Sequence, residues 1–87
     1  MQGSYRLVIK RKAEKEIRGL PRAIRQQVVA RIQSLVDEPR PLGSEKLTGR
    51  EAYRIRSGSY RVIYTVEDDC LVVEVVRVAH RSNVYRR

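Results

Sequence analysis

Residues 53–64 read Y-R-I-R-S-G-S-Y-R-V-I-Y, and this stretch decides the fold. Two runs of alternating apolar and basic side chains flank a turn-forming segment, residues 57–59, which is the pattern of a β-hairpin. Strand side chains point to opposite faces at every second residue. We therefore expect Arg54, Arg56 and Arg61 to converge on one face of the hairpin, with tyrosine and aliphatic side chains on the other.

Three guanidinium groups at such short range repel one another, so the arrangement suggests an anionic partner. The forked donors of arginine match phosphate oxygens well. A solvated outer sheet face would show the same alternation, because charged and apolar residues alternate in any half-buried strand. The pattern therefore identifies a candidate phosphate site but does not exclude an ordinary surface.

Composition favours nucleic acid or an acidic protein as the partner. The 87 residues suit a single small domain, residues 1–87, and carry a net charge of +9. The sign of the charge does not choose between those two partners. Cys70 is the one cysteine, and no residues have metal-ligand spacing or form a nucleotide-binding glycine loop, so neither a metal nor a cofactor is expected. No signal peptide or membrane span is recognisable, which indicates a cytoplasmic protein.

Before the hairpin, the chain predicts one strand and two helices. Residues 4–10 alternate as a strand does, residues 11–19 have helical spacing and end on a glycine, and Pro21 can start a second helix. The second helix should end near Glu38, since prolines follow at once. Its apolar stripe recurs at helical offsets and consists of Ile24, Val28, Ile32, Leu35 and Val36.

After the second helix we expect a long loop over residues 39–50, then the hairpin, a solvated acidic turn at residues 67–69, and a last strand over residues 70–80. The last strand is too apolar to lie at an edge, so it should be central. The order is β-α-α-β-β-β. This predicts an α+β domain whose helical pair packs on one face of a mainly antiparallel sheet, leaving the arginine face to solvent or ligand.

His80 is the one histidine and the one side chain that ordinarily exchanges a proton near neutral pH. A surface or structural histidine is the alternative. The end of the last strand can bring His80, Arg81 and Tyr85 near the arginine face, where a tyrosine ring could stack on a base. With no metal ligands, these parts suit attack by an RNA 2′-hydroxyl on its neighbouring phosphate, with arginines stabilising the developing charge.

Three segments resemble the RelE toxins of the RelE/ParE toxin–antitoxin superfamily: K-L-T-G-R from Lys46, the hairpin from Tyr53, and V-A-H-R-S-N-V-Y-R from Val78. The resemblance spans nearly the whole chain, and the C-terminal segment favours RelE over ParE. It implies a RelE-like fold and a ribosome-dependent endoribonuclease that cuts mRNA in the ribosomal A site. It also implies inhibition by a cognate RelB-like antitoxin.

The resemblance assigns roles by position. Arg54 and Arg56 stand where the family has basic, often lysine, residues, one of which serves as the general base. Arg56 departs from that pattern, because arginine does not readily act as a base, and we expect it to hold phosphate instead. Arg61 matches a phosphate-stabilising arginine. A later catalytic arginine corresponds to His80 or Arg81. Further candidate catalytic and RNA-binding residues are Tyr85, which matches a base-stacking tyrosine, and the basic residues Lys10, Arg11, Lys12, Lys46 and Arg50.

Two other functions remain open. A ParE-like toxin would use the same fold to poison DNA gyrase by protein contact, without a catalytic site. A non-catalytic basic module would bind RNA and do nothing further. His80, Arg81 and Tyr85 favour the nuclease, because gyrase contact requires neither a proton donor nor a stacking ring.

Overall fold

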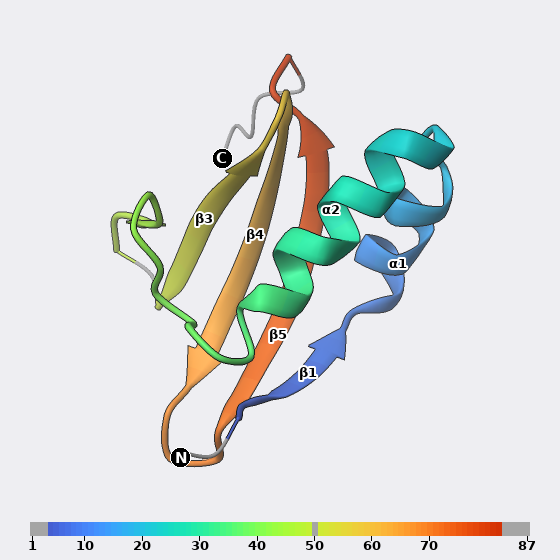
Figure 1. Cartoon of the computed structure of the whole chain (residues 1–87). Helices are drawn as coiled ribbons and strands as arrows, with labels where there is room; N and C mark the ends of the chain where they lie inside the picture. Colours follow the sequence, from blue (N-terminus) through green and yellow to red (C-terminus); the bar gives the residue numbers. More distant parts are fainter. Residues whose placement is uncertain (1–3, 50, 83–87) are drawn as a thin grey trace.

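The computed structural model describes residues 4–49 and 51–82, which form a two-layer domain of two helices on a five-stranded sheet (Figure 1). The sheet order is β1-β5-β4-β3-β2. Only β1 and β5 are parallel; the other neighbours are antiparallel. The elements along the chain are β1 (Arg6–Ile9), α1 (Arg11–Arg18), α2 (Arg22–Ser34), β2 (Glu45–Lys46), β3 (Ala52–Ser57), β4 (Tyr60–Glu67) and β5 (Val72–His80). The predicted α+β class and the mainly antiparallel sheet are confirmed.

The β3–β4 hairpin closes as the sequence predicts. Ser57 pairs with Tyr60, so the loop between them contains only two residues. Gly58 has a φ of +60°, which L side chains rarely adopt, and it occupies the first loop position, as in a type II′ turn. The glycine is therefore what allows so short a loop at this end of the sheet.

The hydrophobic core lies between the two helices and one face of the sheet. The helices contribute their apolar stripes to this core. The strands contribute the side chains that point to the same sheet face as Tyr64. Its buried members are Ala13, Ile17, Val28, Ile32, Leu35, Ile55, Val62, Tyr64, Val66, Val73, Val75 and Val78. Strand β5 lies between β1 and β4, as expected for so apolar a segment. The core fixes which sheet face the helices cover.

Helix α2 ends four residues earlier than the prolines alone predict. The chain tightens after Ser34, where Leu35 and Val36 donate to carbonyls three residues back, at 3.0 and 3.2 Å. The carbonyl of Val36 then accepts the N–H of Tyr5 at 2.8 Å. The N–H of Tyr5 therefore satisfies a carbonyl that the end of the helix leaves without an intrahelical partner.

The loop predicted over residues 39–50 is not entirely loop. It contains β2, whose two residues pair with β3 as Glu45 with Arg54 and Lys46 with Tyr53. A two-residue strand shows no periodicity in the sequence, so only pairing with β3 reveals it. This short strand brings an acidic side chain to the edge of the arginine face.

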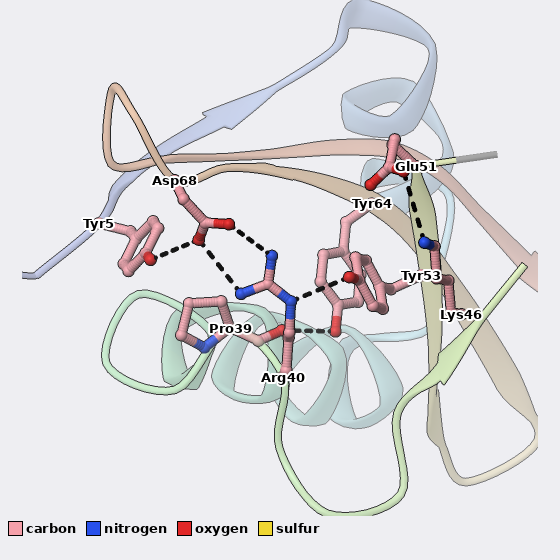
Figure 2. A network of polar contacts seen from close by, with 8 residues as sticks. All are labelled: Tyr5, Pro39, Arg40, Lys46, Glu51, Tyr53, Tyr64 and Asp68. Carbon is pink, nitrogen blue, oxygen red and sulfur yellow. Dashed lines mark hydrogen bonds and ion pairs between the residues drawn. The ribbon is translucent and has the colours of Figure 1, made fainter.

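A polar network holds the start of this loop against the sheet (Figure 2). Arg40 donates to both carboxylate oxygens of Asp68, at 3.2 and 2.8 Å, and its Nε donates to the Tyr53 hydroxyl at 2.9 Å. Tyr5 also donates to Asp68, at 2.8 Å, and Tyr64 donates to the Pro39 carbonyl at 2.7 Å. We call these residues the Arg40 clasp. The acidic turn predicted to be solvated thus provides, through Asp68, the centre of a structural contact.

The sheet face away from the helices is less open than predicted. Ala52, Ile63 and Ala79 lie on it, and their exposed fractions are only 2%, 5% and 8%. The arginine side chains on this face therefore surround buried apolar residues. In the described residues, no helix is long and apolar enough to span a membrane.

Candidate active site

The arginines of the hairpin meet on the sheet face opposite the helices. Arg56 and Arg61 are direct partners across β3 and β4, and Arg54 pairs with Ile63 two residues along each strand. Directly opposed residues project to the same face, and residues two apart on a strand do too. The three guanidinium groups therefore share one face, as the alternation in residues 53–64 predicts.

Within the described residues, Glu45 is the acidic side chain that forms an ion pair with this cluster, and sequence reasoning missed it. Its carboxylate forms an ion pair with Arg54 across β2 and β3. The hydrogen bond from Arg54 lowers the pKa of Glu45 most, and the positive charges of Arg54, Arg56 and Arg61 lower it further. The arginine cluster thus already holds one intramolecular anion, and the signal that could have identified it was the pairing of residues 45–46 with β3.

Arg81 joins Arg56 and Arg61 around a small cavity of about 70 Å³. The cavity lies beside the hairpin turn, and its lining consists of Arg56, Gly58, Ser59, Tyr60, Arg61 and Arg81. The backbone N–H of Arg81 donates to the Ser59 carbonyl at 2.7 Å, which fixes the end of β5 to the turn. In the described part of the chain, the buried Nε of Arg61 has no hydrogen-bond partner. Buried donors are almost always satisfied, so this unpartnered nitrogen is an exception beside the cavity.

His80 lies on the opposite sheet face, which corrects the expectation that it approaches the arginines. Its direct partner is Tyr60, on the helix-covered side, and the two rings are edge-to-face with centroids 5.1 Å apart. The Nδ1 of His80 accepts the Ser82 backbone N–H at 3.1 Å and lies 2.8 Å from the Ser82 hydroxyl. His80 and Arg81 are adjacent in the chain, but only Arg81 lines the cavity formed with Arg56 and Arg61.

The other basic candidates lie outside the arginine cavity. Lys10, Arg11 and Lys12 are exposed at the junction of β1 and α1. Lys46 is on β2 and forms an ion pair with Glu51 at 3.4 Å. Arg50 and Tyr85 fall outside the described residues, so the RNA contact predicted for Arg50 and the base stacking predicted for Tyr85 stay predictions.

The arrangement suits charge stabilisation on a phosphate. Guanidinium groups stay protonated at neutral pH, so Arg56, Arg61 and Arg81 can donate hydrogen bonds to phosphoryl oxygens but cannot readily remove a proton. Preorganised donors of this kind stabilise a transition state without reorganising during the reaction. Over residues 4–49 and 51–82, no three His, Cys, Asp or Glu side chains group closely enough to hold a metal ion.

The chain is similar in sequence to toxins of type II toxin–antitoxin systems. A family model described as the ParE toxin of the parDE system matches residues 7–85. The mRNA interferase toxin RelE of Escherichia coli is 36% identical over 87 residues, which cover 94% of this chain and 90% of that protein. Toxin RelE of Mycobacterium tuberculosis is 31% identical over 84 residues, covering 94% and 87%.

Solved structures agree with the sequence matches. RelE in the intact RelBE toxin–antitoxin complex of E. coli superposes with a TM-score of 0.78 at 31% identity, covering 95% of this chain and all of that one. The archaeal RelE–RelB complex of Pyrococcus horikoshii gives a TM-score of 0.79 at 29% identity, covering 93% and 99%. The family model, the full-length relatives and the shared fold together establish that this chain belongs to the RelE toxins of the RelE/ParE superfamily.

Proposed function

We propose that this protein is a ribosome-dependent endoribonuclease that cuts mRNA in the ribosomal A site without a metal ion and so inhibits translation. Its RelE relative in E. coli is named an mRNA interferase. The observation that carries the proposal is the cavity beside the hairpin turn, where the three basic side chains of Arg56, Arg61 and Arg81 come together.

The reaction we propose is attack of an RNA 2′-hydroxyl on its own 3′-phosphate. The 2′-oxygen forms a bond to phosphorus, the bond to the leaving 5′-oxygen breaks, and the products are a 2′,3′-cyclic phosphate and a 5′-hydroxyl. Arg56 and Arg61 stabilise the charge on the phosphoryl oxygens. DNA lacks the attacking hydroxyl, so it is not a substrate.

The proton acceptor for the 2′-hydroxyl is unassigned, whereas two residues are candidates to serve the leaving 5′-oxygen. Arg81 is the stronger of them, because it lines the same cavity as Arg61 while His80 lies beyond the sheet plane. Arg54 would position the RNA backbone, and Tyr85 would stack on the target base. Lys10, Arg11, Lys12, Lys46 and Arg50 would add electrostatic contacts with RNA.

The test is a primer-extension map of a defined mRNA incubated with purified protein, with and without ribosomes programmed to that mRNA. Cuts within A-site codons only in the ribosome lane support the proposal. Protein that is folded by circular dichroism yet cuts in neither lane would overturn it.

We further propose that a cognate RelB-like antitoxin inhibits the toxin. RelE proteins of E. coli and P. horikoshii are solved in complexes with RelB. The charge of +9 suits an acidic, partly helical antitoxin segment that masks the arginine face. Co-purification with the product of the neighbouring gene, and loss of mRNA cleavage in that complex, would test this partner.

A second candidate is gyrase poisoning, because the matching family model is described as a ParE toxin. A gyrase poison acts by protein contact and does not need free guanidinium donors in a cavity. Inhibition of DNA supercoiling by the purified protein, with no cleavage of mRNA on ribosomes, would favour this candidate over the nuclease.

A further inference from the structure

A second and larger cavity lies on the other side of Arg56. Its volume is about 280 Å³, and its lining consists of Arg31, Gly43, Glu45, Arg54 and Arg56. Arg56 also lines the smaller cavity beside the hairpin turn, so the two cavities adjoin. Arg31 comes from α2 and is held in place because its Nε donates to the backbone carbonyl of Arg56 at 3.2 Å.

The charges of this second cavity do not balance. Glu45 is the one carboxylate in its lining against three guanidinium groups, and that carboxylate is bound to Arg54. Within the described residues, Arg31 and Arg56 have no acidic partner. The bond from the Arg31 Nε to a carbonyl leaves its two terminal nitrogens as donors, which is the fork that binds phosphate oxygens.

Gly43 keeps the wall of this cavity bare. Its φ of +97° is one that L side chains rarely adopt, and a Cβ built there would lie 4.0 Å from a terminal nitrogen of Arg31. Any side chain at position 43 would therefore be strained by the backbone conformation, and its Cβ would reach contact distance of Arg31.

We propose that this second cavity binds the RNA backbone phosphate next to the scissile one, with Arg31 as the contacting residue. The proposal rests on the proposed nuclease function. Successive phosphates of one strand would then occupy the two cavities on either side of Arg56. A single-stranded backbone held at two phosphates is fixed in direction as well as position, so Arg31 helps to align the 2′-hydroxyl with the phosphorus that it attacks.

The test combines Arg31→Gln with synthetic messengers on programmed ribosomes under single-turnover conditions. Arg31→Gln should slow cleavage of an unmodified messenger about tenfold, as expected for loss of one charge-assisted contact. The matched control is Arg22→Gln, which removes the same charge from the same helix but outside both cavities; it should change the rate less than about twofold.

The second arm replaces each phosphate that flanks the scissile one, in turn, by an uncharged methylphosphonate. One replacement should slow the wild-type protein, and on that messenger Arg31→Gln should cause no further loss. This result separates a phosphate contact from a structural effect through Arg56, because a displaced Arg56 would slow cleavage of every messenger.

Equal rates for the Arg31 and Arg22 variants would overturn the proposal. The proposal would also be overturned if Arg31→Gln slowed cleavage of both modified messengers as much as it slows cleavage of the unmodified one. Arg31 would then have a structural role. An Arg31 variant that cuts normally but escapes an acidic antitoxin would reassign the cavity to protein binding. Wild-type protein that cuts no messenger would instead refute the nuclease function itself.

Discussion

Arg56 and Arg61 are direct cross-strand partners, one residue pair away from the turn at Gly58. Like charges directly opposite one another destabilise a sheet, and the carboxylate of Glu45 offsets only part of this repulsion. Repulsion among the arginines of the cluster therefore lowers the stability of the folded protein. Such an arrangement is expected where an anionic ligand supplies the missing negative charge.

Arg61→Ala should abolish messenger cleavage on programmed ribosomes, with a rate loss of about a hundredfold or more, because in the proposed mechanism Arg61 stabilises the charge on the reacting phosphate. The melting temperature should not fall much, since the substitution also removes a repulsive charge. Arg6→Ala on β1 removes an equal charge at the far side of the sheet and is the control. Undiminished cleavage by the Arg61 variant would remove this residue from the mechanism.

Glu45→Gln should tighten binding to a short single-stranded RNA several-fold, since Arg54 would then be released from its ion pair and the cluster would gain net positive charge. Fluorescence anisotropy at a series of salt concentrations measures the effect. Glu67→Gln makes the same change in net charge at the end of β4. If both variants tighten binding equally, Glu45 acts only through total charge and has no local role.

Asp68→Asn should lower the melting temperature at neutral pH and have little effect in acid. The hydrogen bond from Arg40 and then that from Tyr5 hold the pKa of Asp68 below its ordinary value of 3.8. A depressed folded-state pKa stabilises the fold above the unfolded-state pKa, and this stabilisation is lost as the pH falls below about 3.8 towards the folded-state value.

Thermal unfolding of wild type and Asp68→Asn across this acid range measures the difference between the two melting temperatures. Asp69→Asn, in the same turn, is the control for loss of one carboxylate. A difference that stays constant down to the most acid pH would show that the Arg40 clasp does not depend on the ionised Asp68.

Leu71→Gly should raise the free energy of unfolding by about 0.5 kcal/mol. Leu71 has a φ of +56°, and relief of about 1–2 kcal/mol of strain exceeds the added unfolded-state entropy of about 0.5–1 kcal/mol. Leu42→Gly is the control, because Leu42 is 99% exposed and is not among the positive-φ residues. Urea unfolding that finds both variants equally destabilised would contradict the strain.

Local patterns were sufficient for most of the fold. Alternation in residues 53–64 identified both hairpin strands and the arginine face, and the apolar run of residues 70–80 identified a central strand. These features depend on neighbouring residues of one chain segment. The end of α2 could not be predicted in the same way, because the hydrogen bonds over three residues that tighten the chain after Ser34 have no counterpart in the local sequence pattern.

The parts of the candidate site that the sequence did not predict depend on pairing between distant segments. Glu45 reaches the arginines only through a two-residue strand, and Arg31 reaches Arg56 from a helix. The face of His80 depends on its pairing with Tyr60, and β4 and β5 shift register between Ile63 and Tyr64. No local pattern contains this information, so sequence reasoning found the arginines but not their surroundings.

Asp68, at the centre of the Arg40 clasp, and the cavity lined by Arg56, Arg61 and Arg81 lie at opposite ends of strand β4, Asp68 at the β4–β5 turn and the cavity at the β3–β4 turn (Figure 1). Strand β4 spans the distance between them with eight residues, a length of roughly 25 Å at the usual rise per residue. Sites this far apart contribute independently to the free energy of unfolding. Substitutions around Asp68 could therefore raise the stability of the fold without disturbing the arginine cavity at the other end of the strand.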